Sequence, residues 1–130
     1  MSIESAIYSR LSTFAGLTAL ISTRIYPLKL PQTVTYGAVT YSKVSGLRNH
    51  QHGGSAQVAE PRFQITAYHT SYASLKGITK QIRLALDAYS GTVSGTKLFF
   101  CFLLNETDLY DDDTKVYYTA LDFRIVHEEV

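Results

Sequence analysis

The chain has 130 residues, a formal net charge of +1, 45% hydrophobic residues and 18% charged residues. This length is typical of one domain with a single core, and the composition excludes an intrinsically disordered chain. A near-neutral balance also excludes a whole-molecule attraction to nucleic acid, a membrane or an acidic substrate.

The cysteine content and the apolar runs bound the cellular setting. Cys101 is the only cysteine, so an internal disulfide is excluded. The N-terminus shows no basic stretch followed by an apolar run, and the longest apolar run, residues 98–104, is too short to cross a bilayer. We therefore expect a soluble protein made in a cytoplasm, with no membrane partner.

The first third of the chain begins with helical periodicity. Apolar residues recur at helical spacing from Ile3 to Ile21, Ser2 is a suitable N-cap, and Gly16 interrupts the pattern, which predicts a broken helix or a helix pair. Pro27 biases Tyr26 away from helical geometry, so residues 24–27 are predicted to be extended. Residues 28–37 then form a loop and residues 38–44 a strand.

Residues 45–60 show neither strand nor helix periodicity and contain three glycines. They predict a long exposed loop, a kind of segment that is often functional or mobile. Its candidates for protein contacts are Arg48, Asn49, His50, Gln51 and His52.

The second half of the chain has the clearest periods. Residues 62–69 alternate as a half-buried strand, and Thr70 or Ser71 caps a helix whose apolar stripe reaches Tyr89, with Gly91 at the C′ position. Two strands, 96–105 and 115–127, are predicted to form a hairpin through an acidic turn at 108–113. The element order favours a single α+β domain over residues 1–130, a mostly antiparallel twisted sheet with helices packed on one face.

Catalytic and metal-binding patterns are weak. His50 and His52 are the main material for a metal site, but a glycine-rich loop lacks the fixed scaffold that a metal needs. The carboxylates of Asp111, Asp112 and Asp113 lie in an exposed turn, where water is expected to keep their pKa values ordinary. We expect no enzyme, cofactor or metal site, and a metal-dependent small-molecule enzyme using the two histidines stays the alternative.

A nucleic-acid-binding module is a further alternative. Five cations fall in or beside the extended middle of the chain, interleaved with tyrosines: Arg24, Lys29, Lys43, Arg48 and Arg62. Their electrostatic footprint is modest and no recognition motif accompanies them. A loose, non-specific contact with passing DNA stays open.

The apolar strand 98–104 needs cover on both faces. Strict alternation would place Leu98, Phe100, Phe102 and Leu104 on one face and Phe99, Cys101 and Leu103 on the other. The helices are expected to cover one face only. A loop or the N-terminal helix covers the second face, or another subunit does, and the latter reading makes Phe100 and Phe102 interface candidates.

Several short runs, in order along the chain, resemble the phage tail completion proteins, also called head-to-tail joining proteins. The runs include Arg24-Ile25-Tyr26-Pro27-Leu28, Pro61-Arg62-Phe63-Gln64-Ile65 and Leu121-Asp122-Phe123-Arg124-Ile125, with shorter ones at 2–4, 7–11, 30–32, 38–41, 44–46 and 108–110. The resemblance implies a non-catalytic virion protein similar in fold to tail terminators. Such proteins form a ring, usually of six copies, that ends tube growth at the head-proximal end of the tail.

The resemblance also implies the partners: further copies of the chain, the tail tube protein, and a head connector or adaptor. A ring needs two different complementary patches on each subunit. Our candidates are the apolar face of 98–104 and a charge pair between the Arg48 loop and the acidic turn of Asp111, Asp112 and Asp113.

Overall fold

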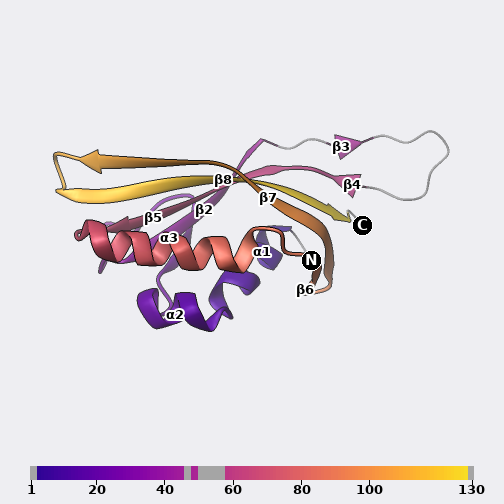
Figure 1. Ribbon diagram of the computed structural model, residues 1–130, viewed down its shortest axis with the longest axis horizontal. Coiled ribbons are helices and arrows are strands. Elements are labelled where there is room, and N and C mark those ends of the chain that lie inside the picture. The colour runs from indigo at the N-terminus through magenta and orange to yellow at the C-terminus, as the bar shows by residue number, and fades with distance from the viewer. Residues whose placement is uncertain (1–2, 46–47, 50–57, 129–130) are drawn as a thin grey trace.

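The structure, a computed structural model, describes residues 3–45, 48–49 and 58–128. Within these ranges the protein is a mixed α+β fold with three helices and a curled, mostly antiparallel sheet of eight strands (Figure 1).

The N-terminal helix pair is confirmed as α1, Ile3–Ser12, and α2, Ala15–Ile21. The break falls at residues 13–14 instead of at Gly16, which lies inside α2. A Cβ on Gly16 would collide with the amide oxygen of Gln81, so this glycine allows α2 to approach the long helix closely. The proposed N-cap, Ser2, lies outside the described residues.

The central strands follow the predicted order. Strand β1, Ile25–Pro27, pairs in parallel with β2, Ala38–Ser45, and the loop 28–37 joins them. Strand β5, Arg62–His69, lies antiparallel between β2 and β8, Val116–Glu128. The predicted alternation of β5 is confirmed, since Phe63, Ile65 and Ala67 are fully buried.

The prediction of a structureless loop over residues 45–60 is wrong at both ends. Residues Arg48–Asn49 form β3, which pairs antiparallel with β4, Val58–Ala59. Strand β4 also pairs with His127 and Glu128 at the end of β8. Strand β4 forms because β8 continues past the start of β5 and offers main-chain partners there, and β3 then pairs with β4. His50, Gln51 and His52 lie outside the described residues.

The long helix α3, Tyr72–Leu86, is confirmed, and the hydroxyl of Ser71 caps it by accepting the N–H of Ser74 at 3.4 Å. Its C-terminal end differs from the prediction. The helix stops at Leu86, the left-handed residue after it is Ala88 with φ 61°, and Gly91 instead begins β6, Gly91–Val93.

The predicted hairpin is confirmed as β7, Thr96–Asp111, with β8. It is longer than expected, because residues 108–110 belong to β7 and the turn occupies 112–115. The sequence predicts that Asp108 and Tyr110 belong to the turn. They stay in the strand because Asp108 bonds to Thr119 and Tyr110 packs on Tyr117, with ring centroids 4.7 Å apart.

Two β-bulges change which residues of β7 face the core. The register skips Phe99 and again skips Leu104, so strict alternation through 98–104 is a wrong prediction. Leu98 and Cys101 are buried, while Phe100 and Phe102 are exposed.

One core cluster joins the helices to the sheet. Ile7, Leu17 and Ile82 of the three helices belong to the same buried cluster as Phe63 and Phe123. In Figure 1 the helices lie below β8 and the outer half of β7.

Arg10 ties α1 to the end of α3. Its Nε–H donates to the Ala85 carbonyl at 2.8 Å, and its guanidinium lies 3.9 Å from the ring centroid of Tyr89.

Candidate protein-interaction surfaces

The described residues contain no group of three or more His, Cys, Asp or Glu side chains that could hold a metal ion. Burial raises the pKa of the Cys101 thiol to about 12, which leaves it protonated and a poor nucleophile at neutral pH. His69 Nδ1 accepts the Ser71 N–H at 3.0 Å, and His127 is buried. The candidate functional features of the described residues are three surface features, which are described in turn below.

The first surface, here called the aromatic patch, consists of Phe100 and Phe102. Their rings stack with centroids 4.3 Å apart, and the side chains keep 39% and 42% of their surface exposed. Their neighbours on β8 are Val126, opposite Phe100, and Arg124, opposite Phe102. Both rings are therefore only partly covered by the described residues.

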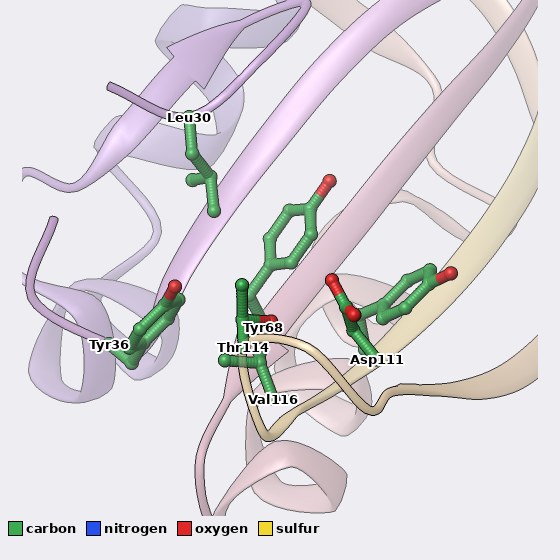
Figure 2. Close-up of a pocket in the computed structure, with 7 residues that line it drawn as sticks. Leu30, Tyr36, Tyr68, Asp111, Thr114 and Val116 are labelled. Atoms are coloured by element: carbon green, nitrogen blue, oxygen red, sulfur yellow. The ribbon is translucent and has the colours of Figure 1, made fainter. Parts of the chain in front are cut away.

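The second surface is a pocket of about 320 Å³ beside the β7–β8 turn. Figure 2 shows Leu30 and Tyr36 on one side of it and Asp111 on the other, with Tyr68 between them. Its lining is completed by Thr114, Val116 and Tyr118.

The pocket combines aromatic walls with one carboxylate. The rings of Tyr68 and Tyr118 stack with centroids 5.7 Å apart. The main-chain N–H of Asp113, 3.0 Å from Oδ1, and then Thr114 lower the pKa of Asp111. The expectation of an ordinary pKa is therefore wrong for Asp111, because the turn itself solvates its charged form.

The acidic turn and the Arg48 strand lie at opposite ends of the sheet. In Figure 1 the β7–β8 turn, with Asp111, Asp112 and Asp113, is at the left, whereas β3, with Arg48 and Asn49, is at the right. The predicted charge pair is thus not formed within one subunit.

The third feature, which sequence reasoning missed, is a charge ladder between α3 and the outer half of β7. Lys76 Nζ lies 2.5 Å from Asp108 Oδ2 and 3.9 Å from Glu106, and Arg83 lies 2.7 Å from Glu106. The Tyr72 hydroxyl also donates to Asp108, at 2.7 Å. Asp108 also accepts a hydrogen bond from Thr119, so it has partners on both α3 and β8.

The ladder changes the acid chemistry of its members. Hydrogen bonds from Lys76 and Tyr72 lower the pKa of Asp108 to about 2, and the bond to Asp108 raises the pKa of Lys76. The sequence does carry a signal for this ladder. Lys76 and Arg83 are seven residues apart, which places them on one face of the helix, and Glu106 and Asp108 are two apart on one strand face.

Several cations proposed for nucleic-acid contact have local partners. Lys43 lies 3.4 Å from Glu4, and Arg62 lies 3.8 Å from Asp122. Arg24 Nε–H donates to the Gly37 carbonyl at 2.8 Å. These contacts reduce the basic footprint that the sequence suggested.

Within residues 3–45, 48–49 and 58–128, no helix has the length and hydropathy to cross a bilayer.

Comparison with known proteins gives the family. The sequence model of the family described as "Tail completion protein gp17" matches residues 5–128. A chain of the solved structure "Virion of native gene transfer agent (GTA) particle" has the same fold, with a TM-score of 0.78 and 19% identity over 98% of this chain and 96% of that one. No curated protein matches the sequence. The chain therefore belongs to the tail completion protein gp17 family, the structural proteins of phage-type tails.

Proposed function

We propose that this protein forms a ring of six copies at the head-proximal end of a long phage tail. There it ends the growth of the tail tube and joins the tail to the head connector. The observation that carries the proposal is the family match over residues 5–128. The fold shared over 98% of the chain with a component of a gene transfer agent virion supports it.

The surfaces suit a protein that works by contact. A closed ring is built from head-to-tail interfaces, in which one patch meets a different patch on the next copy. The aromatic patch lies on a different part of the sheet from the pocket and the acidic turn, which share Asp111. In this proposal the helices back one face of the sheet and leave the other to neighbours, which are further copies, the tail tube protein and a head connector or adaptor.

The role requires no chemical step, so we propose a non-enzymatic protein without cofactor or metal. Assembly takes place in the host cytoplasm and the product resides in the virion. Any contact with the passing DNA is non-specific, because the paired cations leave a weak electrostatic surface.

The test is electron microscopy of particles made without this protein, with the wild-type protein supplied in trans as control. Overlong tubes, together with heads and tails left unjoined, are the expected result. The two defects report separately on termination and on joining. Particles of normal tail length joined to heads in the absence of the protein would overturn the proposal.

A second measurement addresses the ring itself. Reconstruction of the head-proximal end of intact tails should place six copies in one closed layer between the tube and the connector. A different copy number would revise the stoichiometry only. A position at the distal end of the tail would contradict the assigned role.

A further inference from the structure

Strand β7 leaves a long edge of the sheet open. Strand β6 covers only its first residues, pairing Gly91–Val93 with residues 96–98. Further along, the Ala88 N–H donates to the Cys101 carbonyl at 2.9 Å, and the Leu103 N–H donates to Asp87 Oδ1 at 3.1 Å. Beyond Leu103, no strand in the described part of the chain lies outside β7.

The register shows which main-chain groups face outward along this edge. The Ile125 N–H donates to the Pro61 carbonyl, so odd-numbered residues of β8 here direct their main-chain groups toward β5. Even-numbered β8 residues therefore bond to β7, and their partners are Asn105, Thr107 and Leu109. The residues between them, Glu106, Asp108 and Tyr110, direct their N–H and C=O groups away from the sheet.

The opposite edge of the sheet is protected, whereas this one is not. Strand β1 has three residues and ends in Pro27, which has no N–H to offer. Residues 104–111 contain neither proline nor glycine. Charged side chains usually guard an edge, but Glu106 and Asp108 are held against α3 by Arg83 and Lys76.

We propose that this open edge of β7, residues 106–110, binds β3 of a second copy by strand addition. Strand β3, Arg48–Asn49, pairs only with β4, so no second strand lies along its other edge in the described part of the chain. The two edges lie at opposite ends of the molecule in Figure 1 and can meet only between copies.

Charge favours the same pairing. Arg48 of the incoming strand would approach the end of β7 that carries Asp111, Asp112 and Asp113. Two different edges in contact make a head-to-tail interface. Such an interface closes into a ring when the rotation between successive copies divides a full circle evenly. The inference rests on the proposed ring and deepens it by naming the strands that join.

Amide hydrogen exchange on free and on assembled protein tests the edge. In the free protein the amides of Glu106, Asp108 and Tyr110 should exchange on the order of 100-fold faster than those of Thr107 and Leu109, which bond to β8. In the ring the two sets should be protected alike. Fast exchange of the first set within assembled rings would overturn the proposal.

A matched pair of variants isolates the main-chain contribution. Glu106→Ala removes the carboxylate but keeps the N–H, whereas Glu106→Pro removes both. Assembly of the proline variant should require a protein concentration on the order of 10-fold higher than the alanine variant, while thermal unfolding of the two stays similar. Equal assembly of the two variants would contradict strand addition.

Cross-linking identifies the partner strand. A Thr107→Cys and Asn49→Cys double variant treated with a short bis-maleimide should give a ladder of oligomers, whereas either single variant should stop at dimers. Buried Cys101 stays out of the reaction. Rings at the tail end without this series of cross-linked oligomers would contradict the strand pairing but not the proposed function. Cross-linked oligomers of a protein whose loss leaves tails normal would contradict the proposed function but not the strand pairing.

Discussion

Lys76 and Asp108 join the long helix to the outer strand of the sheet, with Nζ 2.5 Å from Oδ2. The same carboxylate accepts hydrogen bonds from Tyr72 and Thr119, so one side chain links α3, β7 and β8. The contact holds the outer half of β7 in place beyond the point where the main core ends.

Replacing Asp108 by Asn should lower the free energy of unfolding by about 1 kcal/mol, since the pair is partly exposed and screened by solvent. Urea titration at low and high salt measures the loss, which should shrink as salt is added. Asp112→Asn, at an exposed turn position, is the control. A loss that does not vary with salt would mean that packing, and not charge, dominates.

The same residue predicts a pH dependence. Its pKa is lowered to about 2 in the folded state from an ordinary value near 3.8, so the folded state favours the charged form. The stabilisation is therefore complete above about pH 4 and is lost as the pH falls toward about 2. Unfolding curves of wild type and Asp108→Asn should converge over that window. Parallel curves down to pH 2 would contradict the assignment.

Gly37→Ala should destabilise the fold by about 1 to 3 kcal/mol, because the added methyl overlaps Ile78 and crowds His69 in a filled space. Gly77→Ala is the matched control. Its methyl would lie 3.8 Å from Leu20, an ordinary contact in mid-helix, so it should be neutral or stabilising by up to about 1 kcal/mol. Thermal unfolding distinguishes the two, and similar behaviour would contradict the predicted difference.

Cys101 should resist thiol reagents at pH 8 in the folded protein, because burial raises its pKa to about 12 and shields the sulfur. Labelling measured across a urea series should follow the unfolded fraction. A Thr107→Cys variant, with its new thiol on an exposed position, should label at once. Rapid labelling of wild type in native buffer would show that this part of β7 opens without global unfolding.

Replacing both rings of the aromatic patch, Phe100→Ser with Phe102→Ser, should abolish incorporation into tails. The cost to unfolding should stay below about 1 kcal/mol, because both side chains are exposed. Leu84→Ser removes an exposed apolar side chain from α3 and should leave incorporation unchanged. Normal tails carrying the double variant would show that the aromatic patch makes no contact needed for incorporation.

Reversing the acidic turn, Asp111, Asp112 and Asp113 to Lys, should prevent ring formation at low salt. Arg48→Glu alone should weaken it too, and the two changes combined should recover part of the loss, since the charges are then complementary again. Analytical ultracentrifugation of the four proteins measures this. Rings that form normally at low salt with the reversed turn would refute the charge contact.

The elements that could be predicted are those whose own side chains show the period of a buried face. Helix α3 and strand β5 are examples, since Leu75 and Ile82, or Phe63 and Ile65, are buried at the expected spacing. Strands β3 and β4 show no period, because each has two residues that are held by a neighbouring strand, β4 by β8 and β3 by β4, and not by an apolar face of their own. Local sequence carries no signal for such a strand.

The site was predictable in part for the same reason. Apolar Phe100 and Phe102 in a short strand suggested an uncovered surface, and both are exposed. The contact of Lys76 with Asp108 depends on β7 lying beside α3, a relationship between segments 32 residues apart in sequence. The pocket combines three separate segments, so no single run of sequence contains it.

The two bulges in β7 allow the strand to change length without changing its faces. Each bulge inserts one unpaired residue, Phe99 or Leu104, between neighbours that stay paired with consecutive residues of β8. Deleting Leu104 would place Asn105 directly after Leu103 in regular alternation, so Glu106 and Asp108 would still face α3. Length differences among relatives in this strand should therefore fall at the two bulges, and not at the paired residues that follow them.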